Sequence, residues 1–317
     1  MRSFRFSYQQ TKKLSSLVND YVANVDSLNM FYNRYPRLEN FSKQYEEKLN
    51  HKIDREKLVQ VLKSQNQELN LSRLSIDNIN SLREQNTFSV TTGHQLCLFT
   101  GPLYFIYKIV STIKLVGELK RKYPEKNFVP VFWMASEDHD FQEVNHLHLF
   151  GKTLEWKTNQ RGAVGRMFLN GMENVLDDLD VLLGNSKNAK YLSSLFRDAY
   201  LKHENLADAS RFLINSLFGK YGLVIIDGDD VRLKKQFISV IKRDVAHQGT
   251  FKTISNCSQA LAKKYKVQAF VRDINFFRLG KGKRILIKEK LFLLIKYFST
   301  GFVKKFFDTI GGSMIPP

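Results

Sequence analysis

Residues 88–156 read FSVTTGHQLCLFTGPLYFIYKIVSTIKLVGELKRKYPEKNFVPVFWMASEDHDFQEVNHLHLFGKTLEW, and this stretch decides the fold. Residues 89–92 form a short β-prone run that ends at Gly93, and residues 128–134 form a second strand that is almost wholly apolar. Fully apolar strands are typical of parallel sheets, and a strand, a helix and a strand in this order favour a right-handed crossover. The sequence therefore predicts an α/β fold with a Rossmann-like parallel sheet at its core.

A long helix is predicted between these two strands. Pro102 suits the first helical position, because the N–H that it lacks would have no partner there. Basic residues 120–122 fall in the last turn, where cations are favourable, and Pro124 ends the pattern. Between these signals, apolar residues recur at spacings of three and four, which predicts one apolar helix face. They are Ile106, Ile109, Val110, Ile113, Val116 and Leu119.

The loop after the first strand is the first part of the predicted site. Ligands bind at the carboxyl ends of parallel strands, and this loop leads into a helix N-terminus, which favours anions. We therefore expect it to bind a phosphate or carboxylate group. Two alternatives stay open, in which Lys108 is a solvated helix residue and Gly101 only starts a helix. The expected binding residues are Gly93, Gln95, Thr100, Gly101, Tyr104 and Lys108.

The second part of the predicted site follows the strand at residues 128–134. Glu137, Asp138, His139 and Asp140 are crowded at its end, and such crowding is costly unless partners or ligands stabilise the charges. The expected catalytic residues are Glu137, Asp138 and His139, one of which is the base. Asp140 is a ligand contact or, alternatively, only a helix cap or a surface acid. Two flanking residues are expected to border the ligand, Trp133 and Asn145.

A third apolar strand, residues 223–226, also ends in acidic residues. Asp227 lies at the strand end and is expected to contact a ribose hydroxyl or a substrate amine, with Asp229 as a second contact. The alternative is that Asp229 or Asp230 caps the helix predicted over residues 231–243.

A metal site is the main alternative chemistry. His146 and His148 would share one face of a strand, as two ligands do, and His139 is close in sequence. The chain has no HExxH motif, no cysteine pair and no clear third ligand, so no bound metal is predicted. Cys97 is either a reactive thiol or, as we expect, a small buried residue.

The chain is predicted to have three parts. Residues 1–85 form amphipathic helices that cover the sheet or shape its entrance. Residues 86–287 form the Rossmann-like core with inserted segments, and residues 288–317 form an atypical basic and apolar tail. The inserted segments are expected to contain short strands near Leu154 and over 164–168, and helices over 175–183, 189–200 and 206–218.

Composition narrows the class of protein. The net charge of +18 is scattered, without a zinc finger, an RGG segment or an RRM-type aromatic string, so nucleic acid is not the expected partner. Two cysteines cannot form a disulfide framework, and the chain shows neither a secretory leader pattern nor a long apolar run. These observations predict a cytoplasmic protein without membrane contact.

Several motifs together resemble the BshC family, the cysteine-adding enzymes of bacillithiol biosynthesis. They are TTGHQLCLFTGPLYFIYKI, VPVFWMASEDHDFQEVNHLHLFG, GAVGRM, LADASRFLINSLFGKYGLVIIDGDD and QAFVRDINFF, spread over roughly residues 3–284. The resemblance implies a core related to the nucleotidyltransferases and a ligase that joins cysteine to glucosaminyl malate. No tightly bound cofactor is expected, but activation of a carboxylate implies ATP as a co-substrate. The HxGH motif of that superfamily is absent, so the mechanism does not follow by analogy.

The resemblance fades near the end of the printed sequence. Members of the family continue into a helical coiled coil that forms a homodimer, whereas this sequence passes after about Ile287 into an unpatterned mixture of Phe, Lys and Ile. We hypothesise a truncated or shifted reading frame, which leaves the dimer segment missing. The alternative function is an inactive remnant that binds a nucleotide or a thiol.

Overall fold

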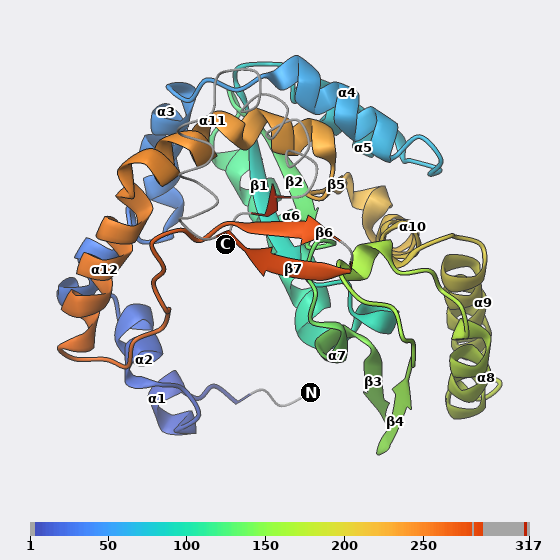
Figure 1. The fold of residues 1–317 in the computed structure, drawn as a ribbon. Helices are drawn as coiled ribbons and strands as arrows, with labels where there is room; N and C mark the ends of the chain where they lie inside the picture. The colour runs from blue at the N-terminus through green and yellow to red at the C-terminus, as the bar shows by residue number, and fades with distance from the viewer. Residues whose placement is uncertain (1–3, 281, 288–313, 316–317) are drawn as a thin grey trace. The chain divides into compact units, whose positions relative to one another are not determined.

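The computed structural model describes residues 4–280, 282–287 and 314–315 (Figure 1). The chain divides into two compact units, which are described separately. The helical unit comprises Met1–Lys52 and Ile241–Asn275, and the core unit comprises Ile53–Val240 and Phe276–Pro317. The predicted boundaries at residues 85 and 287 stay predictions, and the proposed frame change falls on residues 288–313, most of the tail, which lie outside the described residues.

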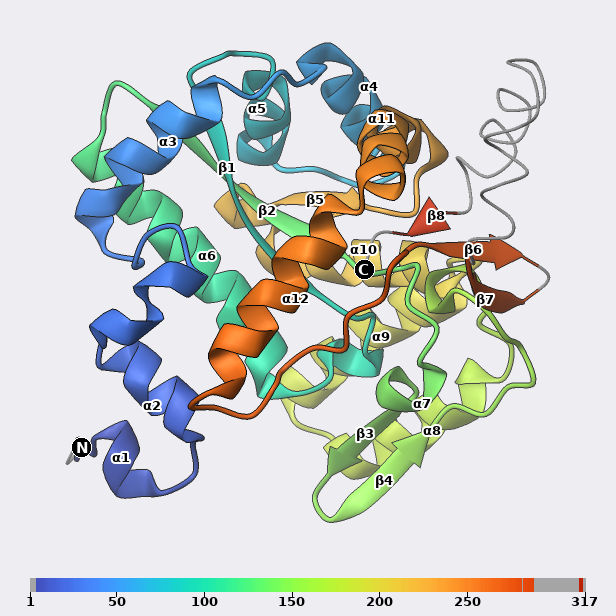
Figure 2. The same ribbon diagram turned by 60° about the vertical axis from the view of Figure 1, so that its left-hand side comes forward.

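A parallel three-stranded sheet forms the centre of the core unit, in the order β1-β2-β5 (Figures 1 and 2). His94 pairs with Met134, and Met134 pairs with Asp227, so the three strands reach the same level at their carboxyl ends. The predicted α/β class with a Rossmann-like parallel sheet is confirmed. The strands are β1 (Thr87–His94), β2 (Asn127–Met134) and β5 (Val224–Asp227).

Apolar side chains of β2 pack on both faces of the sheet, as its composition predicts. Phe132 and Met134 belong to the larger core, which includes residues of the crossover helix α6 (Leu103–Lys122). Val129 and Val131 pack against the opposite face in a second cluster. That cluster contains side chains from α4 (Arg55–Gln65) and α5 (Arg73–Ser81).

The crossover helix ends where the sequence predicts but begins one residue later, because Pro102 is its N-cap residue rather than its first helical residue. Three basic residues occupy its last turn, and the helix ends at Lys122, two residues before Pro124. Ile109, Val116 and Leu119 are buried on the predicted apolar face, but Val110 is 46% exposed. The face is therefore narrower than the spacing of apolar residues alone indicates.

An inserted segment between β2 and β5 supplies a hairpin and four α-helices. The predicted strand over residues 164–168 is wrong, because Val164–Arg166 is a 3-10 helix, η4. The N–H of Val164 donates to the Asp138 carbonyl, and that of Gly165 donates to the Ser136 carbonyl, so this segment is fixed on the loop after β2. The elements are α7 (Phe141–Val144), β3 (His146–Leu149), β4 (Lys152–Glu155), α8 (Met172–Leu183), α9 (Lys187–Leu201) and α10 (Leu206–Phe218).

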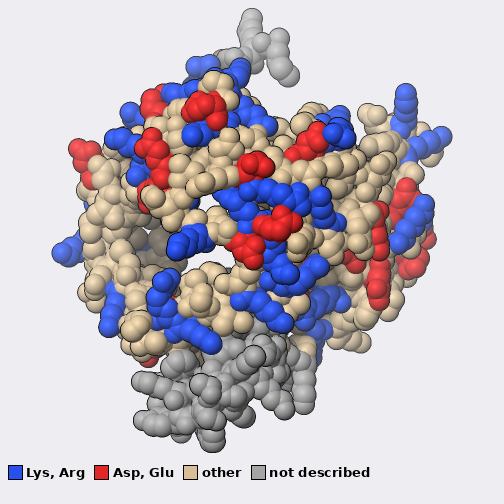
Figure 3. All heavy atoms as spheres, turned by 90° about the horizontal axis from the view of Figure 1, so that it is seen from above, with Lys and Arg blue, Asp and Glu red and all other residues tan. Residues whose placement is uncertain are grey.

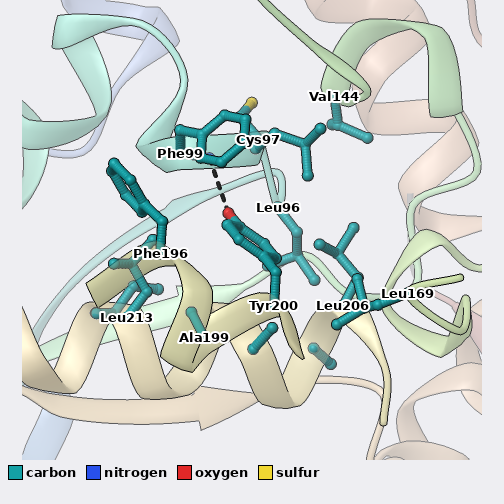
Figure 4. Close-up of a cluster of buried hydrophobic side chains, with 14 of the residues drawn as sticks. Leu96, Cys97, Phe99, Val144, Leu169, Phe196, Ala199, Tyr200, Leu206 and Leu213 are labelled. Atoms are coloured by element: carbon teal, nitrogen blue, oxygen red, sulfur yellow. Dashed lines mark hydrogen bonds between the residues drawn. The ribbon is translucent and has the colours of Figure 1, made fainter. Parts of the chain in front are cut away.

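Helix α9 reaches the loop after β1 through the main buried cluster (Figure 4). The Tyr200 hydroxyl accepts a 2.8 Å hydrogen bond from the Phe99 N–H, and the two rings meet edge to face. Phe99 and Thr100 have positive φ angles of 55° and 73°, which are unfavourable for non-glycine residues. Packing around Tyr200 thus supports a strained turn of the loop.

A second sheet of the core unit was not predicted. Its antiparallel order is β7-β6-β8, and Phe277 of β6 pairs with both Leu286 and Ile315. Within the described ranges, none of the helices has the length and apolar character needed to cross a membrane. The strands are β6 (Phe277–Gly280), β7 (Lys283–Leu286) and β8 (Met314–Ile315).

The helical unit has its own contacts. Tyr21 packs against Tyr32 and Tyr35, and Asp20 binds both Lys264 and Tyr265. Helix α11 (Val231–His247) contributes residues to both units, which divide after Val240. The other helices are α1 (Tyr8–Thr11), α2 (Ser16–Val22), η1 (Asp26–Phe31), η2 (Leu38–Asn40), α3 (Phe41–Leu49) and α12 (Gly249–Ala262).

Candidate functional site

The loops after β1 and β2 meet at the carboxyl end of the sheet. Gln95 Nε2 lies 2.8 Å from Asp138 Oδ2 and 2.6 Å from Glu143 Oε2, so one amide group connects both loops. Asp138 also accepts hydrogen bonds from the backbone N–H groups of His139 and Asp140. The structure therefore brings together Gln95, Asp138 and His139, as the topology predicts.

Asp138 has the properties of a fixed carboxylate. Burial alone would raise its pKa, but the hydrogen bonds from Gln95 and from the two backbone N–H groups outweigh burial and lower the pKa below its ordinary value. The side chain is 26% exposed. An ionised, partly accessible carboxylate suits an ammonium group or an imidazolium as its partner.

Glu137 lies in a different environment from Asp138. It is 8% exposed, and its Oε2 is buried without a hydrogen-bond partner among the described residues. Burial raises its pKa, and the charges that act on it are those of Lys234, Asp229 and Asp227, after β5. The four polar residues 137–140 thus do not form one cluster, because Glu137 belongs electrostatically to the loop after β5.

Asp227 is held by internal partners. Its carboxylate accepts hydrogen bonds from the Ser136 hydroxyl, from the Asp229 N–H at 2.9 Å and from Arg211 at 3.1 Å. Burial raises the pKa of Asp227, although the Ser136 hydrogen bond and the charge of Arg211 act in the opposite direction. The expected contact with a ribose or an amine would have to compete with these donors. In this structure the Asp227 carboxylate instead links the loop after β5 to Ser136 and Arg211.

Asp229 and Asp230 have separate roles. Arg166 contacts both carboxylate oxygens of Asp229, at 2.5 and 2.8 Å, and Lys234 contacts the same carboxylate, which is 9% exposed. Asp230 accepts from the Arg232 N–H at 2.8 Å, in the first turn of α11. The capping alternative therefore holds for Asp230, whereas Asp229 pairs with cations.

The glycine-containing loop is stabilised internally at the positions expected to bind an anion. Lys108 Nζ donates to the Gly93 carbonyl at 2.5 Å and lies 5.3 Å from the centre of the Tyr104 ring. A Cβ on Gly101 would lie 2.4 Å from Cys97 Cβ, so the backbone approaches Cys97 closely at this point. Lys108 is therefore a loop contact, and the backbone at Gly101 packs against Cys97. Thr100 follows Phe99 in the strained turn.

Trp133 lies between two glycines at the end of the central strand. A Cβ on Gly93 would lie 3.3 Å from Trp133 Cβ, and a Cβ on Gly228 would lie 2.2 Å from Trp133 Cζ2. The indole is 38% exposed. Trp133 thus remains available as a ligand contact, whereas its two neighbours must be small.

Asn145 is buried and Asp140 is exposed at the start of α7. Asn145 is buried and donates to the Trp156 carbonyl at 3.2 Å, so it holds the base of the β3–β4 hairpin. Asp140 precedes α7, but its side chain makes no capping hydrogen bond. Their expected roles in binding stay predictions.

The metal alternative gains no support from the histidines. The His146 and His148 rings lie on the same strand face, 4.9 Å apart, but the described residues contain no group of three His, Cys, Asp or Glu that would hold a metal ion. Cys97 is 9% exposed, and burial raises the pKa of its thiol to about 11. Its burial agrees with a small core residue rather than a reactive thiol.

The site contains basic residues that sequence analysis did not identify. Arg166 and Arg211 come from η4 and α10, and both reach the acids after β5. Arg284 Nη1 lies 3.5 Å from His139 Nδ1. Arg166 and Arg211 lie in the quoted motifs GAVGRM and LADASRFLINSLFGKYGLVIIDGDD, which were usable signals. Nothing in the spacing of Arg284 indicates the strand end that it approaches.

Cavities lie beside these groups. One of about 330 Å³ is bordered by Gln65, Arg211 and the acids after β5. Another, of about 600 Å³, is bordered by His139 and Arg284. On the face shown in Figure 3, basic side chains are interspersed with acidic ones, which is typical of a solvated surface. The expectation that nucleic acid is not a partner stays a prediction.

Comparison with known proteins identifies the family. Residues 1–299 match "Bacillithiol biosynthesis BshC, N-terminal Rossmann-like domain". Two relatives, each named "Putative cysteine ligase BshC", come from Flavobacterium psychrophilum (51% identical, covering 88% of this chain and 53% of the relative) and Flavobacterium johnsoniae (48%, 92% and 55%). A third with the same name, from Bacillus cytotoxicus, is 24% identical over 87% of this chain.

The chain spans about half the length of these relatives. Because the family match covers nearly all of it, the chain belongs to the BshC family.

Proposed function

We propose that the protein takes part in the ligation of L-cysteine to the amino group of glucosaminyl malate, in the last step of bacillithiol biosynthesis. The observation that carries the proposal is the contact of Gln95 with Asp138, which joins two strand ends of a BshC-family core beside His139. The names of its relatives supply the reaction class. The small-molecule substrates and a cytoplasmic setting belong to the same proposal.

The reaction needs an activated carboxylate. We propose that ATP converts the cysteine carboxylate to an acyl adenylate, with release of pyrophosphate, or to an acyl phosphate, with release of ADP. The amine then attacks the acyl carbon, AMP or phosphate leaves, and the nitrogen loses one proton as the amide forms. For the nucleotide we favour the start of α6 and the Thr100 hydroxyl, because the first N–H groups of a helix suit an anion.

His139 and Asp138 are proposed as the pair that handles this proton. His139 Nδ1 lies 3.5 Å from Asp138 Oδ1, and the imidazole is 48% exposed, so a substrate can reach it. In the proposed step, the imidazole accepts the amine proton and the Asp138 carboxylate stabilises the imidazolium that forms. Gln95 keeps Asp138 in position.

The test is ligation by the purified protein supplied with cysteine, glucosaminyl malate and ATP, with the amide product measured by mass spectrometry. Asp138→Asn and His139→Ala should each reduce the rate about 100-fold or more, with unchanged thermal unfolding. His148→Ala, at a strand position away from Asp138, and Asp198→Asn, at a surface ion pair, are matched controls that should keep the wild-type rate.

Two outcomes would contradict the proposal. Wild-type rates in both Asp138→Asn and His139→Ala would remove this pair from the mechanism. Nucleotide binding by the wild-type protein without any turnover would favour the alternative of a binding remnant.

A further inference from the structure

The cavity of about 600 Å³ beside His139 has a positively charged lining. Arg161 and Arg284 border it, and no Asp or Glu is among the described residues that line it. Apolar side chains also border it, among them Phe141, Met167 and Leu286. A space whose described lining has two guanidinium groups, apolar side chains and no carboxylate suits a small organic anion.

Arg284 is held in a defined orientation. Its guanidinium carbon lies 3.9 Å from the centre of the Phe277 ring, which is within the range of a cation–π contact. Its Nη1 lies 3.5 Å from His139 Nδ1, so the same side chain borders both the cavity and the proposed base. A planar guanidinium fixed in this way is suited to bind a carboxylate through two parallel hydrogen bonds.

Arg161 supplies the second charge from another segment. Its side chain is exposed, and it makes no ion pair within the part of the chain that the structure describes. Next to it, a Cβ on Gly162 would lie 3.2 Å from Gly282 Cα, so the two backbones pass each other closely. This approach brings Arg161 to the hairpin that carries Arg284, and both line one cavity.

We propose that this cavity binds a dicarboxylate, with Arg161 and Arg284 each pairing with one carboxylate group. The inference rests on the proposed function for its biological ligand, which is the malate half of glucosaminyl malate. That half has two carboxylates on a short hydrocarbon chain, which matches two arginines and the apolar side chains that border the same cavity. Binding there would place the amino sugar beside His139, because His139 borders the same cavity.

A triphosphate is the other anion with suitable charge, and the lining favours the dicarboxylate over it. The lining is rich in apolar side chains, and among the helices that the structure describes, only α7 begins at the cavity, with four residues. Such a short helix offers little of the N-terminal dipole on which phosphate sites depend.

The experiment is calorimetric titration of the full chain with L-malate and with glucosaminyl malate, without cysteine or ATP. The wild-type protein should bind both, and methyl glucosaminide, which has no carboxylate, should bind at least about tenfold more weakly than glucosaminyl malate. Arg161→Gln and Arg284→Gln should each raise Kd for glucosaminyl malate about 10-fold to 100-fold. Arg284→Lys should recover only part of this loss, because a lysine cannot form the paired hydrogen bonds.

Arg73→Gln is the control for loss of one positive charge, since Arg73 lies at an exposed ion pair on α5. It should leave Kd unchanged. Thermal unfolding shows whether Arg284→Gln disrupts the hairpin. If it does, Arg161→Gln still tests the site, because Arg161 is exposed.

The outcomes separate this inference from the proposed function. Unchanged Kd in both arginine variants, or no binding of glucosaminyl malate by the wild-type protein, would overturn the dicarboxylate site whatever the ligation assay shows. In a separate titration of the same variants with ATP, a loss of ATP affinity with unchanged malate affinity would assign the two arginines to the nucleotide and overturn the dicarboxylate site. Arginine-dependent malate binding without ligation would leave the site in place and contradict the ligase proposal.

Discussion

The Gln95 side chain and the Asp138 carboxylate lie 2.8 Å apart and join the loops that follow two neighbouring parallel strands. The same amide group also contacts Glu143, so one polar side chain donates hydrogen bonds to two carboxylates. Gln95 thus acts on the charge state of Asp138 without needing to touch a substrate.

Replacing Gln95 with Leu should change the pH dependence of ligation. The Gln95 hydrogen bond is the main interaction that lowers the pKa of Asp138 against the effect of burial, so its loss raises that pKa. Asp138 would then become protonated at a higher pH, and the acid limb of kcat/KM should move upward. Gln60→Leu, at an exposed position of α4, is the control. An acid limb at the wild-type position would show that Asp138 is not the group that titrates.

Replacing Glu137 with Gln should stabilise the protein increasingly as pH rises. Burial raises the pKa of Glu137 in the folded state, so the folded protein retains a proton that the unfolded chain releases near pH 4.3. Wild-type stability therefore falls as pH increases from about 4 to the raised pKa, and the Gln variant lacks this loss. Urea unfolding from pH 4.5 to 7.5 measures the difference, with the exposed Glu84→Gln as control. A difference that is independent of pH would mean that Glu137 is ionised in the folded protein.

Gly228→Ala should destabilise the core unit by about 1–3 kcal/mol, because its methyl group would overlap the Trp133 indole. In a Trp133→Ala background the same change should cost much less, and a double-mutant cycle measures this coupling. Gly117→Ala is the matched control, since a Cβ there meets nothing within 4 Å and the residue lies inside α6. The control should stabilise the helix by about 0.5–1 kcal/mol. Equal costs of Gly228→Ala in both backgrounds would rule out the predicted overlap.

Tyr200→Phe should lower the free energy of unfolding by about 1–3 kcal/mol. The change removes the acceptor of the Phe99 N–H and leaves that buried donor unsatisfied. Tyr191→Phe, on the exposed side of the same helix, should change stability by less than about 0.5 kcal/mol. Equal stability of the two variants would indicate that the Phe99 N–H finds another acceptor.

The central sheet and the position of the site could be predicted because they depend on local patterns. Apolar runs identify β2 and β5, Pro102 identifies the start of α6, and polar residues after each strand identify the edge. The different environments of Glu137 and Asp138 could not be predicted, since they depend on which neighbouring loop each side chain meets.

The wrong prediction for residues 164–168 has a similar cause. The apolar residues Val164, Met167 and Phe168 resemble part of a strand, but a Cβ on Gly165 would lie 2.5 Å from Ser136 Cβ. Only the absence of a side chain lets this turn lie on the loop after β2. Arg161 and Arg284 were missed because they are far apart in sequence and meet only through the approach of Gly162 to Gly282.

Through the hydrogen bond between Tyr200 and Phe99, the inserted helix α9 stabilises the conformation of the loop after β1. If α9 undocks, even briefly, the left-handed turn at Phe99 and Thr100 loses its support and can relax. Gln95 lies on that same loop, so a change in the loop would weaken the hydrogen bond from Gln95 to Asp138. Substitutions in the inserted segment, remote from the candidate site, would then displace the site residues without unfolding the protein.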